Sequence, residues 1–230
     1  MDNGQDLSQK ALEVHRRLLD HYGDPERKTR RPPLDELVLT ILSQNTNDTN
    51  SGRAWQSLRE RFPTWEAVRR AETDEVAKAI QVGGLAHIKA PRIQAILAKL
   101  AEERGALDMG FLQHMPPQEA RHYLLNLPGV GPKTAACVLL FSLHKPALPV
   151  DTHVHRVSSR LGLLPARTGA EKAQDILEKL LPVELYYPFH LNMIRHGRML
   201  CTARAPQCPI CPLLDLCDYA RSKERTTKSS

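Results

Sequence analysis

The sequence contains no hydrophobic run long enough to cross a lipid bilayer, which requires about 18 consecutive apolar residues. Its opening segment, MDNGQDLSQK, is polar where a secretory signal peptide would be apolar. It also has no low-complexity linker and no internal repeat of fixed period. These absences argue against a membrane-spanning, secreted or repeat protein, and they predict a cytoplasmic protein with no membrane partner.

The composition excludes a wholly disordered chain, because 41% of the 230 residues are hydrophobic and can form a buried core. The length fits one large domain or two smaller ones. Lys and Arg number 32 against 26 Asp and Glu, a formal net charge of +6. This balance favours an anionic partner such as nucleic acid, and a basic surface without a specific partner is the alternative.

No long segment alternates apolar and polar residues with the period of a β-strand. Apolar residues instead recur at helical spacing, as in the set Leu34, Leu37, Val38, Ile41 and Leu42 and the set Ile93, Ile96, Leu97 and Leu100. Glycine and proline interrupt these patterns at residues 23–25, 32–33, 83–84, 116–117, 128–129, 146–149 and 182. The sequence therefore predicts an all-α fold of about ten short helices.

The segment LPGVGPKTA, which begins at Leu127, has the composition of a tight turn before a helix. Gly129 and Gly131 permit positive φ and a close approach of the backbone to a ligand, and Pro132 suits the first helical turn. The free amides at such a helix N-terminus can bind a phosphate oxygen whatever the base sequence. An ordinary connection between two helices is the alternative.

Five cysteines are present, and four of them crowd into 17 residues with the spacing C-x6-C-x2-C-x5-C: Cys201, Cys208, Cys211 and Cys217. This clustering indicates a metal centre and not a disulfide framework. Four thiolates can hold either Zn²⁺ or a [4Fe–4S] cluster, and spacing alone does not distinguish the two.

Three segments together carry a resemblance to a known family: LPGVGPKTA, PVDTHVHRVSSRLGLL and HGRMLCTARAPQCPICPLLDLCDY. They resemble the endonuclease III family of helix-hairpin-helix DNA glycosylases, in register from about Leu34 to Tyr219. The resemblance implies two helical domains with the DNA cleft between them. Residues 34–145 would form a six-helix barrel with the helix-hairpin-helix motif, and residues 1–33 and 146–230 would form the domain of a [4Fe–4S] cluster bound by the four cysteines.

The family likeness also implies a function. It implies a monomeric, bifunctional DNA glycosylase and AP lyase of base excision repair, acting on double-stranded DNA with oxidised pyrimidines or abasic sites. Lys133 would be the nucleophile that forms a Schiff base with the sugar, and Asp151 would assist it, although Asp151 also fits a simple helix N-cap. The alternatives are an adenine-mispair glycosylase, whose branch carries a different residue in place of Lys133, and a non-catalytic DNA-binding iron–sulfur module.

The remaining site residues implied by the resemblance are those that would contact DNA. A flipped-out nucleotide leaves a vacancy, which either Gln44 or Asn45 would fill from one loop while Leu85 inserts from another. Asp48 matches a carboxylate of the family's active-site cleft. The other implied DNA contacts lie in the hairpin and beside Asp151: Leu127, Gly129, Val130, Gly131, Thr134 and His153.

Overall fold

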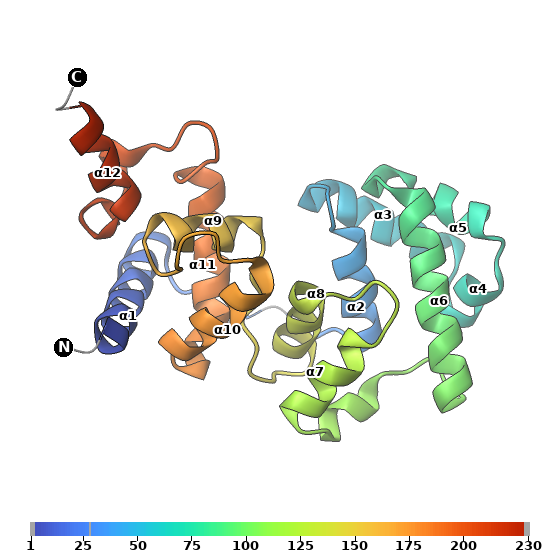
Figure 1. Cartoon of the computed structure of the whole chain (residues 1–230). Coiled ribbons are helices and arrows are strands. Elements are labelled where there is room, and N and C mark those ends of the chain that lie inside the picture. The colour runs from blue at the N-terminus through green and yellow to red at the C-terminus, as the bar shows by residue number, and fades with distance from the viewer. Residues whose placement is uncertain (1–2, 28, 228–230) are drawn as a thin grey trace. The chain divides into compact units, whose positions relative to one another are not determined.

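The computed structural model describes residues 3–27 and 29–227, and within them the chain forms twelve α-helices with short 3-10 and π segments and no strand (Figure 1). The all-α prediction is therefore confirmed. No helix in this part of the chain has both the length and the hydropathy that crossing a membrane requires.

The chain divides into two compact units. The hairpin unit comprises residues 29–145, and the cysteine unit comprises residues 1–28 and 146–230. Both chain ends thus belong to the cysteine unit, and the hairpin unit is an insertion between them.

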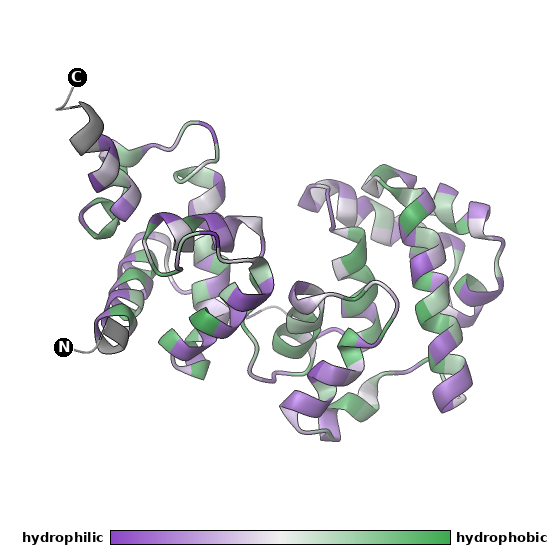
Figure 2. Ribbon diagram, viewed as in Figure 1, coloured by the Kyte–Doolittle hydropathy of each residue, from purple (hydrophilic) through white to green (hydrophobic). Residues whose placement is uncertain are grey.

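The hairpin unit contains the segment LPGVGPKTA and is built from seven α-helices and three short segments. In chain order these are α2 (Pro33–Leu42), α3 (Asp48–Arg61), α4 (Trp65–Arg70), α5 (Thr73–Ala79), η1 (Gln81–Gly83), α6 (Ala86–Arg104), η2 (Gly110–His114), α7 (Pro117–Leu125), α8 (Pro132–Cys137) and the π segment η3 (Val138–Ser142). Helix α2 packs against α3, α6 and α8 and is buried over most of its length. Figure 2 accordingly shows mainly hydrophobic residues along α2.

Helix starts in this unit follow the local sequence. Pro33, Pro117 and Pro132 each occupy the first turn of a helix, where a missing N–H has no cost. The Asn47 side chain accepts a hydrogen bond of 2.8 Å from the amide of Asn50 and caps α3. Such short-range signals place the helix ends that hold the candidate residues.

The cysteine unit consists of α1 (Asn3–Tyr22), α9 (Thr152–Arg160), α10 (Ala170–Leu180), η4 (Val183–Leu185), α11 (Tyr186–Met199), η5 (Cys208–Ile210), η6 (Leu214–Leu216) and α12 (Asp218–Thr227). Helix α11 packs against α1 and α9, and its Phe189 is fully buried. Arg17 on α1 pairs with Asp215 at 2.5 Å and donates to the carbonyl of Pro212 at 3.2 Å. The N-terminal helix is therefore fastened to the cysteine-bearing segment.

Candidate functional site

The turn between α7 and α8 has one residue that only glycine suits. Gly129 adopts a φ of 69°, and a Cβ atom there would also collide with the side chain of Arg92. Gly131 is different, because its φ of −96° and ψ of 177° are open to any residue and a Cβ would meet nothing within 4 Å. Both glycines permit positive φ, and of the two Gly129 alone adopts it. The lack of a side chain at Gly131 leaves open space beside the backbone.

The backbone of this turn presents unpaired donors. Among the described residues, no carbonyl accepts a hydrogen bond from the amides of Gly129 and Gly131. Leu127 and Val130 are buried, and the Val130 amide donates to the Leu127 carbonyl at 3.1 Å. These two residues therefore anchor the turn with their side chains, while the glycine amides are available to an anion.

Lys133 is the second residue of α8 and is half-buried. Its positive charge acts on Glu36 of α2, a carboxyl that is only 9% exposed and lies 3.6 Å from Arg31. Burial raises the pKa of Glu36, and the charges of Arg31 and Lys133 partly oppose that rise. Sequence analysis missed Glu36; the signal was an ionisable residue between the apolar positions of α2.

The two candidates for filling a vacated base position both lie on the loop after α2, and their surroundings differ. Gln44 donates to the hydroxyl of buried Thr134 at 3.2 Å and accepts from Arg92 at 3.1 Å. Asn45 is exposed and has a φ of 53°, in the left-handed region. Asp48, the first residue of α3, is also exposed. Gln44 therefore joins this loop to α8, and Asn45 stands on the loop surface.

Leu85 lies on a second loop of the hairpin unit. It precedes α6, has a φ of 51° and is 40% exposed, which is unusual for a large apolar side chain. The preceding Gly84 also has positive φ, at 69°. Asn45 and Leu85 thus both have left-handed backbone, and both lie on the surface of the hairpin unit.

Asp151 caps α9 in the cysteine unit. One of its oxygens, Oδ1, accepts from the amides of His153 at 2.9 Å and Val154 at 2.8 Å. Within the described part of the chain its second oxygen, Oδ2, has no hydrogen-bond partner. Asp151 therefore caps α9 with one carboxylate oxygen, and its other oxygen stays available for another partner. His153 is held by Arg156, whose Nη2 lies 3.0 Å from its Nδ1.

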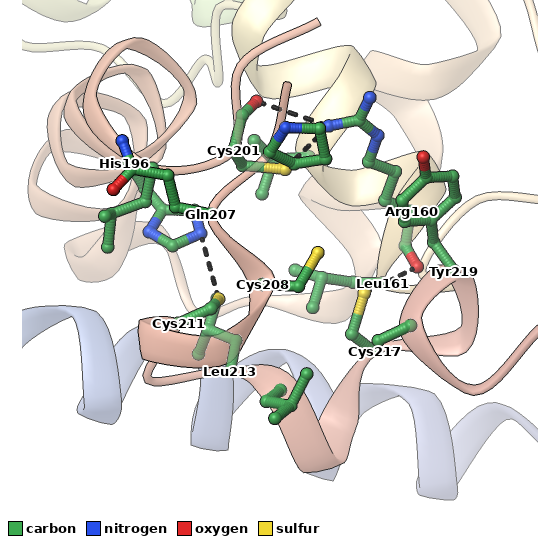
Figure 3. Close-up of a pocket in the computed structure, with 15 residues that line it drawn as sticks. Arg160, Leu161, His196, Cys201, Gln207, Cys208, Cys211, Leu213, Cys217 and Tyr219 are labelled. Atoms are coloured by element: carbon green, nitrogen blue, oxygen red, sulfur yellow. Dashed lines mark hydrogen bonds between the residues drawn. The ribbon is translucent and has the colours of Figure 1, made fainter. Parts of the chain in front are cut away.

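The four clustered cysteines line one cavity of the cysteine unit, together with Arg160, His196, Gln207, Tyr219 and apolar side chains (Figure 3). In the ranges 3–27 and 29–227, no three His, Cys, Asp or Glu side chains converge closely enough to hold a single metal ion. The donor set, four thiols around one cavity, fits the four cysteine ligands of a [4Fe–4S] cluster.

The surroundings of the thiols disfavour free thiolates. Burial raises the pKa of the Cys211 thiol to about 11 and also raises that of Cys217. A bound metal centre would stabilise the thiolates that burial disfavours. Arg160 adds a positive partner, donating to the sulfur of Cys201 at 3.2 Å (Figure 3).

Comparisons with known proteins agree with this geometry. Residues 38–183 match the HhH-GPD superfamily of base excision DNA repair proteins, and residues 201–217 match the iron-sulfur binding domain of endonuclease III. The endonuclease III of Thermotoga maritima is 36% identical over 211 residues, which are 92% of this chain and 93% of that protein. A putative DNA glycosylase of Arabidopsis thaliana is 40% identical over 166 residues, but the aligned part is only 57% of its length.

The fold is also similar to that of solved structures. A trapped covalent intermediate of endonuclease III with DNA has a TM-score of 0.82 and 30% identity, covering 95% of this chain and 99% of that one. A non-covalent endonuclease III–DNA complex has the same TM-score, with 31% identity. The iron–sulfur match, together with the cysteine pattern, assigns a [4Fe–4S] cluster to the chain.

Proposed function

Because this chain belongs to the endonuclease III family of helix-hairpin-helix DNA glycosylases and AP lyases of base excision repair, we propose that it excises oxidised pyrimidines and then cleaves the abasic strand. The finer features of this activity rest on the arrangement of its own residues. We further propose that it acts as a monomer on double-stranded DNA in the cytoplasm, at the nucleoid.

The observation that carries the proposal is the position of Lys133. It lies two residues beyond Gly131, at the N-terminus of α8, where the unpaired amides of Gly129 and Gly131 can bind a phosphate. A phosphate held by these amides would place the neighbouring deoxyribose within reach of the Lys133 amine. The same turn then fixes the DNA backbone and delivers the nucleophile.

The proposed reaction begins when the Lys133 amine attacks C1′ of the damaged nucleotide. The bond from C1′ to the base nitrogen breaks, the base leaves as the protonated product, and opening of the sugar ring gives a Schiff base. Loss of a C2′ proton then expels the phosphate from C3′ and cleaves the strand by β-elimination. The free oxygen of Asp151 is suited to stabilise positive charge on the sugar and to accept a proton.

We assign Asn45 and Leu85 to the space left by the everted nucleotide. Both side chains are exposed, and a left-handed residue on each loop turns the chain at that point. Gln44 is less suited, because its amide is already engaged with Thr134 and Arg92. We propose that Asp48 and His153 also contact the DNA.

We propose Cys201, Cys208, Cys211 and Cys217 as the ligands of the cluster. When bound, the cluster supplies a rigid cross-link for the segment that contains these cysteines, and base excision itself needs no electron from it. Arg160 would then stabilise the charge of the Cys201 ligand.

Borohydride trapping tests the assignment of Lys133. Reduction of the Schiff base on a duplex with a thymine glycol or an abasic site should give a covalent protein–DNA adduct. The adduct should disappear in Lys133→Gln and persist in Lys78→Gln, a matched change of an exposed lysine in the same unit. An undiminished adduct in Lys133→Gln, or no adduct with the wild type, would contradict the proposal.

A further inference from the structure

Lys89 is among the largest fully buried side chains of the residues that the structure describes, with 1% of its surface exposed. Burying an ammonium is costly unless its donors are satisfied, and burial lowers the pKa of Lys89. In the described part of the chain no carboxylate pairs with it. Its partners are two main-chain carbonyls, those of Leu42 at 2.7 Å and Gly83 at 2.9 Å.

Both carbonyls belong to helix ends. Leu42 is the last residue of α2 and Gly83 is the last residue of η1. The final carbonyls of a helix have no partner within it and carry partial negative charge. One ammonium from α6 therefore satisfies the ends of two separate elements.

Each of these ends leads directly into one of the two loops assigned to the vacated base position. Asn45 follows Leu42 by three residues, and Leu85 follows Gly83 by two. Both have left-handed backbone, with φ of 53° and 51°, which L residues rarely adopt unless the surrounding structure imposes it.

The two loops also approach each other closely. A Cβ atom at Gly83 would lie 3.0 Å from the Cβ of Ala54 and 3.7 Å from the carbonyl oxygen of Leu42. Glycine at this position thus lets the end of η1 lie against α3 and the end of α2, where Lys89 reaches both carbonyls.

We infer that Lys89 is a positioning residue that joins the two base-replacing loops into one rigid unit, so that Asn45 and Leu85 enter the duplex together when a nucleotide is everted. This inference rests on the proposed function. It assigns Lys89 to the opening of double-stranded substrate and not to the chemistry at the sugar.

The experiment compares a substrate that needs opening with one that does not. Single-turnover excision from a thymine glycol duplex requires eversion, whereas β-elimination at an abasic site in single-stranded DNA does not. A third readout is the fluorescence of 2-aminopurine placed opposite an abasic analogue in a duplex, which reports insertion of the loops. Lys89→Met removes all donors at nearly constant length, and Lys78→Met is the control at an exposed lysine of α5.

We expect Lys89→Met to excise the duplex lesion about a hundredfold more slowly, since small misplacements can cost that much, and to lose the fluorescence change. Its single-stranded lyase rate should stay within about twofold of the wild type, as should every readout of Lys78→Met. Equal loss of duplex and single-stranded activities, or no loss of either, would overturn the inference. Absence of both activities in the wild type would instead refute the proposed function.

A second variant covers the case in which Lys89→Met does not fold. Gly83→Ala keeps Lys89 but places a methyl group 3.0 Å from the Cβ of Ala54, so that the end of η1 or Ala54 must shift by a few tenths of an ångström, and φ at Gly83 lies outside the left-handed region. It should show the same selective loss on the duplex, with the same circular dichroism spectrum as the wild type. Wild-type duplex excision by a folded Gly83→Ala protein would contradict the role of the joined loops.

Discussion

At the scale of single residues, Glu36 is an ionisable group whose burial opposes its charge. It is 9% exposed, and its position on α2 places it within the influence of Lys133 and of Arg31. Its pKa is raised, so the folded protein holds the Glu36 proton more tightly than the unfolded chain does. Ionisation of Glu36 therefore costs folding free energy.

The sign of this effect gives a prediction for Glu36→Gln. Below the ordinary carboxyl pKa of about 4.3, Glu36 is protonated in both states and the penalty is absent. As the pH rises through the raised folded pKa, the wild type loses stability that the glutamine variant keeps. Urea unfolding should therefore show the variant gaining stability relative to the wild type between pH 4 and pH 8. A relative loss over that range would mean that the pair with Arg31 outweighs burial.

The candidate site residues could largely be predicted from sequence motifs, but their backbone conformations and exposure could not. The sequence pointed to Gln44 or Asn45 without separating them, because the separation depends on Arg92 and Thr134, which are distant in the chain. As an apolar residue at a helix start, Leu85 would be expected to be buried. It is instead exposed and has a left-handed φ. The nearby Lys89 amine bonds to carbonyls of two separate elements, and no local sequence pattern predicts such contacts.

At the scale of elements, helix ends marked by proline or glycine were predicted and ends made by tertiary contacts were not. Pro33, Pro117 and Pro132 begin α2, α7 and α8 as expected. The separation of α4 from α5 was missed. There Gln94, on α6, donates to the carbonyls of Val68 at 3.0 Å and Ala71 at 2.7 Å and so satisfies the end of α4.

The turn between α7 and α8 gives the second prediction, since its two glycines serve different purposes. Gly129→Ala should lower the melting temperature, with a loss of at least about 1 kcal/mol, because positive φ and Arg92 both oppose a side chain. Gly131→Ala should melt like the wild type and still bind an abasic-analogue duplex more weakly, because its methyl group would stand where a phosphate approaches. Thermal melting and fluorescence anisotropy measure the two effects. Wild-type affinity in Gly131→Ala would show that no phosphate approaches Gly131.

At the scale of the whole molecule, the cysteine unit is assembled from both ends of the chain, and the segment that carries the four cysteines connects them. Arg17 joins α1 to this segment through Asp215, and Arg160 joins α9 to it through Cys201. The sequence predicted the cysteine set and the iron–sulfur cofactor. It could not predict these arginine partners, because arginine is common on helix surfaces and its partner is specified only by the fold.

Loss of the cluster should therefore loosen the cysteine unit and spare the hairpin unit, which has its own core. We expect Cys201→Ser to lose the broad absorption near 400 nm and to exchange amide hydrogens at least about tenfold faster in α1, α9 and residues 201–217. Helices α2 to α6 should exchange as in the wild type. Cys137→Ser, a change at a buried cysteine of the hairpin unit, should keep the absorption. Equal acceleration in both units of Cys201→Ser would mean that the two share one folding transition, and unchanged exchange would mean that the cluster does not hold the chain ends together.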